Sequence, residues 1–435
     1  MAPHRDVPPT PDPSATDAGD VVPGTAAPGT APGGPADRLP LAAVLVMALT
    51  GFLLIATETM PAGLLPQIAE GMGTSEGVAG QFVSVYALGT VVAAIPAVAL
   101  TRGMRRRPVF LAAVLGFLVA NVVTAVSGVL VLSLVARFVA GAFSGLLWGM
   151  TAGYARRITP PRLAGRALAI ASVGTPVGLA IGTPFGSWLG TTFDWRWSFG
   201  TLAVLTLVTL VLAATMVPDA PGQEASSQTP AARIVRIPGV AVVLAVIVAW
   251  MLGHNVLYTY VSSYLDAGGV GLSVDLALVV FGVAALVGIA ITGVLIDRTL
   301  RPLVLASIAG FVVAGVVFGL GRESTVAVIG AIVLWGVAFG GAAAQLQTAI
   351  GRAAGDDADV ANSMLGVAFN LAIFAAGVLG AVVVGGAGGS ALPVAMVALA
   401  VVALSVAVLG RRAAFPVRPS VVQAPRPVPL PGDAA

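Results

Sequence analysis

The stretch LAAVLVMALTGFLLIATETMPAGLL, residues 41–65, decides the fold of this chain. It is almost entirely apolar, and about 20 consecutive apolar residues are enough for a helix to span a lipid bilayer. One residue, Glu58, breaks the apolar pattern. It places a carboxyl group inside hydrocarbon, which costs about 2.5–3.5 kcal/mol. Such a residue is usually retained for a task, such as carrying a proton or holding a solute.

The whole composition supports a membrane protein. Of the 435 residues, 57% are hydrophobic and only 9% are charged, and the mean hydropathy is +0.98. Soluble domains carry about 25% charged residues, so a water-soluble fold could not hide this much apolar surface. With no cysteine and two histidines, the chain offers no disulfide or thiolate metal site, and we expect no metal and no cofactor.

Apolar segments of spanning length recur along the chain and predict an all-α integral membrane protein with twelve transmembrane helices. The segments are residues 41–66, 79–100, 109–127, 130–152, 165–190, 198–217, 237–262, 275–296, 303–320, 325–350, 361–385 and 391–410. Residues 1–38 and 413–435 are rich in proline and lack apolar periodicity, so we expect disordered tails. The first tail is not a signal peptide, because its polar residues separate the start from the first apolar run.

The arginines predict the orientation. All 22 basic residues are arginine; 19 lie in the tails and alternate loops on one side, Arg196 and Arg322 lie on the other, and Arg137 lies within a segment. By the positive-inside rule, the side with 19 is cytoplasmic. We therefore expect a multi-pass protein of the plasma or inner membrane with both termini in the cytoplasm.

The chain also repeats itself. The basic turn at Arg102 after the second segment and that at Arg298 after the eighth are 196 residues apart, as are the starts of segments five and eleven near Gly165 and Ala361. This repeat predicts two pseudo-symmetric six-helix bundles, residues 39–217 and 237–412, joined by a cytoplasmic linker at 218–236.

These features resemble a known family. The twelve-segment plan, the basic turns and the run Leu134, Arg137, Gly141 and Gly145 resemble the major facilitator superfamily. The stretches TETMPAGLLP (57–66), DWR (194–196) and AFNL (368–371) resemble its drug and metabolite proton antiporters, a branch that includes arabinose-type sugar exporters and chloramphenicol-resistance exporters. The resemblance covers about residues 40–410.

The resemblance implies a function and its partners. It implies proton-driven export of a small organic compound, such as an antibiotic or a sugar-like metabolite, through a cavity that opens alternately inward and outward. The partners would be the lipid bilayer, the small-molecule substrate and protons, with no nucleic acid, and the protein would function as a monomer. A facilitator or importer without proton exchange remains an alternative.

Two non-transport readings are weaker. A membrane-embedded enzyme would need a catalytic constellation, and none is visible, so we expect no enzymatic activity. A transport-inactive sensor would normally carry a folded signalling domain, for which the tails are too short.

Glu58 and Arg137 are the residues expected to couple transport to protons. Burial disfavours the charged form of a carboxyl, so Glu58 could load and release a proton. In the family, an arginine at the position of Arg137 is tied to proton transfer through hydrogen bonds. The alternatives are that Glu58 only hydrogen-bonds a substrate and that Arg137 only grips backbone carbonyls between helices.

The loop signature of the family predicts gating residues. It reads glycine, three residues, aspartate, arginine, then glycine and two arginines. The second half keeps its aspartate as Asp297, while the first half has Ala97 and Thr101 at the glycine and aspartate positions, so an acid–arginine latch is expected only in the second half. The alternative is that these arginines serve only topology. The gating residues expected are Arg102, Arg105, Arg106, Gly293, Asp297, Arg298 and Arg301.

A stripe of small residues marks segment five. Spacing by four places glycines on one helical face, where another helix can approach closely. The stripe loosely resembles the antiporter signature of the family, although Thr183 stands where the signature has glycine; simple close packing is the alternative. Its members are Gly174, Gly178, Gly182, Pro184 and Gly186.

Polar and aromatic side chains within segments are expected to line the substrate cavity, which suits varied and partly apolar molecules. His254 and Tyr258 share a helical face at positions i and i+4. Alternatively, His254 is a satisfied core residue and the aromatic residues belong to an interfacial belt. The expected cavity residues are Trp148, His254, Asn255, Tyr258, Gln345 and Asn370.

Overall fold

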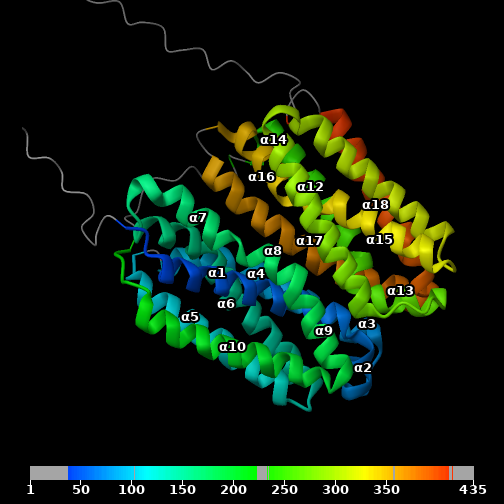
Figure 1. Ribbon diagram of the computed structural model, residues 1–435, viewed down its shortest axis with the longest axis horizontal. Helices are drawn as coiled ribbons and strands as arrows, with labels where there is room; N and C mark the ends of the chain where they lie inside the picture. Colours follow the sequence, from blue (N-terminus) through cyan, green and yellow to red (C-terminus); the bar gives the residue numbers. More distant parts are fainter. Residues whose placement is uncertain are drawn as a thin grey trace, which may run out of the picture. The chain divides into compact units, whose positions relative to one another are not determined.

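The computed structural model describes residues 38–101, 103–222, 233, 235–355, 358–410 and 414, and the described residues from Leu39 onward belong to one compact unit. Every regular element in these ranges is helical (Figure 1). The two expected tails lie outside the described residues, apart from Arg38 and Ala414.

The helices of the N-terminal half run from Leu41 to Met216. They are α1 (Leu41–Thr59), η2 (Met60–Gly63), α2 (Leu65–Met72), α3 (Glu76–Ala79), α4 (Gln81–Thr101), α5 (Arg106–Val126), α6 (Leu130–Arg157), η3 (Pro161–Leu163), α7 (Ala164–Ser172), α8 (Gly174–Val177), η4 (Gly178–Gly182), α9 (Thr183–Thr192) and α10 (Trp195–Met216).

The helices of the C-terminal half follow the linker. They are α12 (Pro238–Thr259), α13 (Val261–Gly268), α14 (Val274–Leu320), α15 (Thr325–Gly340), α16 (Ala342–Ala354), α17 (Ala358–Ala387), η6 (Gly389–Ala391) and α18 (Leu392–Leu409).

Eleven helical stretches of the described chain are long and apolar enough to cross a bilayer. One of them, α14, has 47 residues and would measure about 70 Å, more than twice a hydrocarbon core of about 30 Å. Its backbone leaves the helical region at Thr299 (φ −134°, ψ 34°), just before Pro302. Proline cannot donate to the carbonyl four residues earlier and crowds it, which breaks the helix there. The two limbs of α14 are thus predicted segments eight and nine, and the all-α membrane fold is confirmed.

Segment five is less regular than the sequence predicts. It consists of α7, α8, η4 and α9, and η4 is a π-helical stretch directly before Thr183 and Pro184. Pro184 has no N–H to donate to a carbonyl within η4, and a π-helical turn accommodates the missing hydrogen bond.

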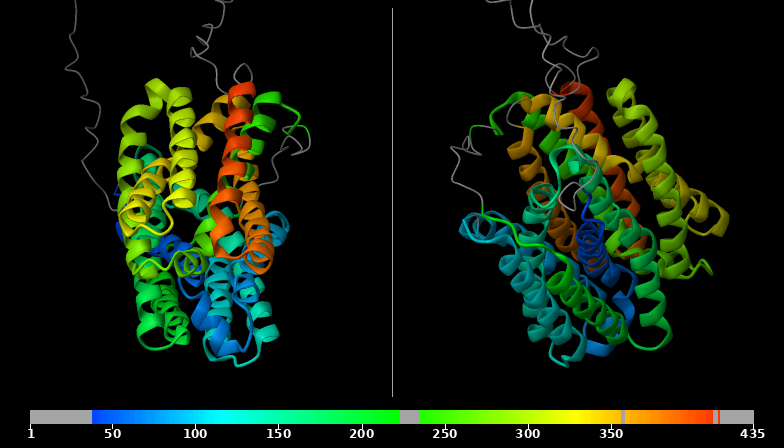
Figure 2. Two further views of the ribbon diagram at one scale, coloured as in Figure 1. Left: turned by 90° about the vertical axis from the view of Figure 1, so that its right-hand side faces the viewer. Right: turned by 60° about the vertical axis from the view of Figure 1, so that its left-hand side comes forward.

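The helices pack within each half and between the halves. In the N-terminal half α6 packs on α4 and α5, and α1 packs on α7 and α10; in the C-terminal half α12 packs on α17 and α18, and α14 packs on α15. Figures 1 and 2 show the α12–α18 group beside the α1–α10 group. The halves meet where α17 contacts α3 and α4, and where α14 contacts η4 and α9.

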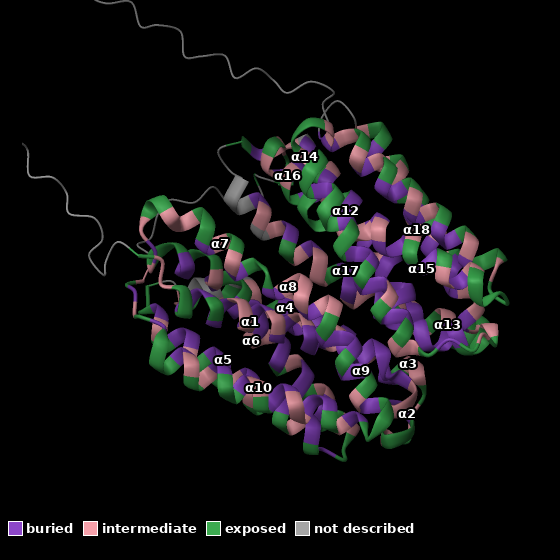
Figure 3. Ribbon diagram, viewed as in Figure 1, coloured by how far each residue is buried: buried purple, intermediate pink, exposed green. Residues whose placement is uncertain are grey.

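We call the two ends of the helix bundle the linker side and the far side. The linker side carries the loop between α4 and α5, the loop between α6 and α7, and the start of the linker; the far side carries α2, α3 and α13. Apolar side chains are exposed around the bundle, for example Leu115, Val119 and Val122 on α5. Figure 3 shows exposed residues along the outward faces of α5 and α10. An apolar stripe spaced at three and four residues fits a helix that faces lipid.

Candidate functional site

Glu58 is buried near the end of α1. The side chain is only 4% exposed, and α1 gives way to the short helix η2 two residues later, where Pro61 stands. No ion pair to Glu58 is formed within the described part of the chain. The structure therefore encloses the carboxyl group in protein without a direct salt bridge.

Arg137 of α6 is fully buried and holds two backbone carbonyls. Its Nε donates to the Phe82 carbonyl at 2.8 Å, and its Nη2 donates to the Thr57 carbonyl at 3.0 Å. In a regular helix the Thr57 carbonyl would accept from residue 61, but Pro61 has no N–H. Arg137 thus satisfies an acceptor that the proline in α1 leaves open, and it joins α6 to α1 and α4.

This arrangement places the cation beside Glu58, because Thr57 directly precedes it. Burial disfavours the charged form of the Glu58 carboxyl, whereas the positive charge of Arg137 favours it. The Arg137 Nη1 atom is buried and has no hydrogen-bond partner among the described residues, so the guanidinium retains donor capacity. A role in proton coupling stays a prediction for both residues. The hydrogen bonds from Arg137 to backbone carbonyls are observed.

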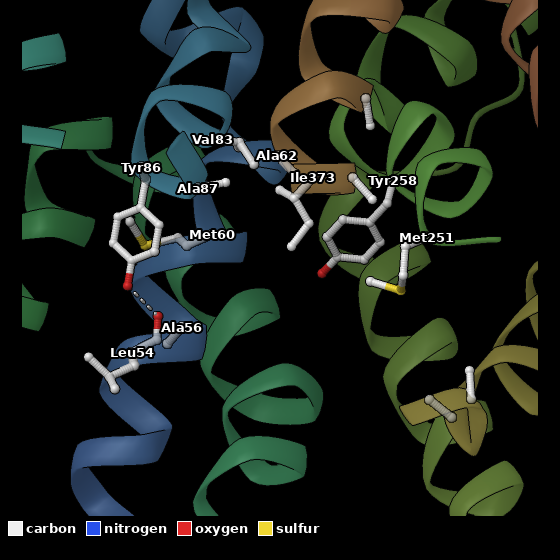
Figure 4. Packing of buried hydrophobic residues seen from close by; sticks show 14 of the residues in the cluster. Leu54, Ala56, Met60, Ala62, Val83, Tyr86, Ala87, Met251, Tyr258 and Ile373 are labelled. Atoms are coloured by element: carbon white, nitrogen blue, oxygen red, sulfur yellow. Dashed lines mark hydrogen bonds between the residues drawn. The ribbon is translucent and has the colours of Figure 1, made fainter. Parts of the chain in front are cut away.

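Two aromatic residues that the sequence reasoning missed complete this region. The guanidinium carbon of Arg137 lies 4.6 Å from the ring centre of Tyr86 and 5.4 Å from that of Phe199, within the range of cation–π attraction. The Tyr86 hydroxyl donates to the Leu54 carbonyl at 3.2 Å, and Figure 4 shows it reaching from α4 to α1. For Tyr86, the sequence signal was its position four residues after Phe82 in a mostly apolar segment.

The predicted cavity residues of α12 are packed in an aromatic cluster. The His254 ring stacks on Phe339 with centres 3.6 Å apart, and His254 Nδ1 accepts a hydrogen bond from Trp335 Nε1 at 3.0 Å. Tyr258 stacks on the same imidazole at 5.2 Å. Asn255 is buried and donates to the Met251 carbonyl at 2.9 Å. This geometry fits the alternative of a satisfied core histidine, while contact with substrate stays a prediction.

The other three cavity candidates lie apart from that cluster. Gln345 is 1% exposed, and its Nε2 donates to Thr292 and Ser307, both at 3.1 Å, which links the two limbs of α14 to α16. Asn370 is half-buried and donates to the Gly366 carbonyl of its own helix at 3.1 Å. Trp148 is 39% exposed. Among the described residues, no hydrogen bond or ring contact joins these three residues to the cluster around His254, and their place in a cavity stays a prediction.

The glycine stripe of segment five packs against α1. A Cβ atom at Gly178 would lie 2.8 Å from the Phe52 carbonyl oxygen, and one at Gly182 would lie 2.9 Å from the Ala56 side chain. A Cβ atom at Gly174 would clash with the Ala48 carbonyl oxygen of α1, and one at Gly186 would lie 2.5 Å from the Met60 sulfur. Pro184 is buried at the start of α9. Close packing accounts for these residues, and a role in antiport stays a prediction.

The gating residues differ between the halves. Arg102 lies outside the described residues, Arg106 is buried, and Arg105 pairs with Asp219 of the linker. In the second half Gly293, Asp297 and Arg298 are exposed, Arg301 is half-buried, and Asp297 forms no ion pair within the described residues. No latch at Asp297 is formed among the described residues of this conformation, and its role in gating stays a prediction. An unforeseen acid–arginine pair, Arg105–Asp219, is formed in the first half.

A set of polar contacts on the far side joins the halves, and we call it the far-side seam. Ser263 of α13 donates to the Glu76 carboxylate of α3. The Tyr260 hydroxyl donates within its own half to the Gly377 carbonyl at 2.7 Å and lies 3.4 Å from the Gly77 carbonyl of the other half. The Gln81 amide reaches across to the Gly377 carbonyl at 3.5 Å. Sequence reasoning missed the seam, because short polar residues at helix ends carry no distinctive pattern. Its residues are Glu76, Gly77, Gln81, Tyr260, Ser263 and Gly377.

Comparisons with known proteins agree with this architecture. The family model described as Major Facilitator Superfamily matches residues 47–377. Two proteins of Mycobacterium tuberculosis, from strains CDC 1551 / Oshkosh and ATCC 25618 / H37Rv, are each named chloramphenicol efflux pump. Each is 30% identical over 348 residues, which cover 77% of this chain and 84% of the relative.

Solved structures share the fold. A crystal structure of a D-xylose–proton symporter superposes with a TM-score of 0.67 at 15% identity and covers 88% of this chain and 98% of its own. A nucleoside transporter gives a TM-score of 0.67 at 11% identity, with 86% and 99% covered.

Proposed function

Because the chain belongs to the major facilitator superfamily, we propose that it exports a small organic compound in exchange for protons. The chain is a membrane transporter and not an enzyme. One observation carries the proposal: Glu58 is buried in α1 beside a backbone carbonyl that the fixed cation Arg137 holds.

The pair supplies the chemistry that proton coupling needs. A buried carboxyl next to a cation can be charged or neutral at modest cost, and small changes in hydration or distance decide which form prevails. Glu58 takes up a proton when the site opens outward and releases it when the site opens inward. Substrate binding to the deprotonated form then couples the two fluxes, because the two conformations differ in their affinity for the proton.

The contacts between the halves support alternating access. The far-side seam holds one end of the interface closed, and a transporter must break such contacts to open that end. We assign the linker side to the cytoplasm and the far side to the exterior, with both termini cytoplasmic, on the arginine distribution. The protein then lies in the cell membrane with its outer side closed, and it works as a monomer.

The relatives support a proposal for the substrate class. Two relatives named chloramphenicol efflux pump cover 77% of the chain, which supports a neutral, partly aromatic antibiotic as substrate. A sugar-like metabolite is the second candidate, because residues 57–66 resemble a branch of antiporters that includes sugar exporters.

Transport in proteoliposomes tests the proposal. Purified protein is reconstituted with a pH-sensitive dye inside, and chloramphenicol is added with and without an imposed pH gradient. We expect gradient-driven accumulation accompanied by opposite proton flux. Chloramphenicol equilibration without proton flux would instead support the facilitator, and proton movement in the same direction as substrate would support a symporter.

A further inference from the structure

The first residues of the linker are bound to the N-terminal half, and we call residues 217–222 the linker strap. Although α10 ends at Met216, Val217 and Ala220 are only 2% and 4% exposed. A tether that merely connects two bundles would leave its residues in solvent. The burial indicates a docked segment.

The strap provides hydrogen-bond acceptors for the first N–H groups of α5. A helix leaves its first N–H groups without partners in the helix itself. The Arg106 N–H donates to the Ala220 carbonyl at 2.9 Å, and the Arg107 N–H donates to Asp219 Oδ1 at 3.1 Å. The next residue, Pro108, has no N–H to satisfy. A carboxylate at a helix N-terminus is also favoured by the helix dipole.

Side chains hold the strap from both neighbouring helices. Arg105 Nε forms an ion pair with Asp219 Oδ2. From α6, the Tyr154 hydroxyl donates to the Pro218 carbonyl at 2.8 Å, and Arg157 Nη1 donates to the Pro221 carbonyl at 2.7 Å. Partial burial acts to raise the pKa of Asp219, but hydrogen bonds from Arg107, Arg105 and Ala220 outweigh it, so the pKa lies below its ordinary value.

The internal repeat shows which residues of the second half correspond to those that contact the strap. The offset of 196 residues places Arg105 opposite Arg301 and Thr101 opposite Asp297. The second half therefore carries its own acid in the basic turn, and the first half carries threonine there. Asp219 brings a carboxylate to the same turn from a distant part of the sequence.

We propose that Asp219 is the acid of the inner basic turn in the N-terminal half, and that it fastens the linker strap to that half. The strap moves with α5 and α6 as one body during the alternating access proposed above, on which this last step rests. The strap then extends the N-terminal unit from Met216, where α10 ends, to Gly222.

Cysteine accessibility in purified protein tests the docking without depending on transport. The natural chain has no cysteine, so Ala220→Cys provides a single reporter at a buried position of the strap. We expect slow modification by a charged maleimide in this background. Asp219→Asn should speed it by about tenfold, because a charge-assisted hydrogen bond is stronger than a neutral one.

Arg105→Gln should speed modification as well, and the double variant should add little to either single change, because the two residues act on one contact. Glu323→Gln removes an exposed acid elsewhere and should change nothing. A second reporter, Ala331→Cys in the buried face of α15, must stay unmodified and detects any general unfolding.

The outcomes are distinct. Equal modification rates with and without Asp219, or fully additive effects of the two substitutions, would overturn the proposal. If Asp219→Asn does not yield folded protein, Tyr154→Phe removes only the contact to Pro218 and should still speed labelling, with no change again overturning the idea. None of these results depends on whether protons drive transport.

Discussion

Ser263 of α13 donates a hydrogen bond to the Glu76 carboxylate of α3, and this contact crosses from one half of the transporter to the other. Beside it, Tyr260 approaches the Gly77 carbonyl to 3.4 Å while donating to Gly377. Hydrogen bonds between the halves thus close the far side.

Weakening the far-side seam should favour opening of that side. Ser263→Ala removes the donor to Glu76, and a lost hydrogen bond of about 1 kcal/mol would raise the open population about fivefold. The measure is the modification rate of a cysteine at Ser84, a fully buried position beside Gly377. Thr191→Ala, an exposed hydroxyl outside the seam, is the matched control. An unchanged rate in Ser263→Ala would show that the seam does not limit opening.

Substitution of Arg137 should affect both stability and coupling. Arg137→Gln cannot reach both the Phe82 and Thr57 carbonyls, and an unsatisfied buried polar group costs about 1–3 kcal/mol. We expect a lower melting temperature in detergent and loss of gradient-driven transport in the protein that remains folded. Coupled transport at the normal rate per folded molecule would limit Arg137 to a structural role.

The sequence indicates where charged groups are buried but not what they contact. Glu58 and Arg137 stand out because an ionisable residue within an apolar run is costly. The partners of Arg137 could not be predicted, because backbone carbonyls lie on every residue and those of Thr57 and Phe82 are 80 and 55 positions away. The open acceptor at Thr57 was nonetheless encoded in Pro61, through the absence of its N–H.

The number of membrane segments could be predicted from the sequence more readily than the points at which helices are continuous or broken. The polar residues around Arg298 predict a turn, yet α14 passes through this region with only Thr299 outside helical geometry. The predicted cavity residue Gln345 donates to Thr292 and Ser307 on the two limbs of α14, a pair of contacts that the sequence does not indicate. Tertiary hydrogen bonds of this kind depend on register between distant helices, which hydropathy does not report.

Asp297 is exposed and forms no ion pair within the described residues of this conformation. A latch that biases alternating access must differ between the two conformations. We therefore expect Asp297→Asn to lower the transport rate several-fold while expression and membrane insertion stay normal. Glu323→Gln, an exposed acid on the far side, serves as control. Transport of Asp297→Asn at the control rate would reduce Asp297 to a helix-end residue.

Orientation can be tested at two glycines with open surroundings. Gly271 lies in the far-side loop between α13 and α14, and Gly103 lies in the linker-side loop between α4 and α5; a side chain fits at both. In intact cells an impermeant maleimide should modify Gly271→Cys and leave Gly103→Cys unmodified until the membrane is opened. The reverse pattern would place the linker and both termini outside.

Glu58→Gln separates proton coupling from substrate binding. Glutamine has nearly the size of the glutamic acid side chain and keeps hydrogen-bonding capacity, but it does not titrate. Because the residue is 4% exposed and forms no ion pair within the described residues, the neutral amide should be tolerated without loss of the fold. We expect Glu58→Gln to bind chloramphenicol and to exchange it across the membrane, yet to lose accumulation driven by a pH gradient.

The controls for Glu58→Gln decide between its two proposed roles. Glu70→Gln neutralises an exposed carboxylate of α2 and should keep full gradient-driven transport. If Glu58 only hydrogen-bonds the substrate, the amide variant should show weakened binding but a normal ratio of protons to substrate. If Glu58 carries the proton, binding persists while proton flux on substrate addition disappears, because no other titratable carboxyl lies buried in the described membrane helices. Full gradient-driven accumulation by Glu58→Gln would rule out this residue as the proton carrier.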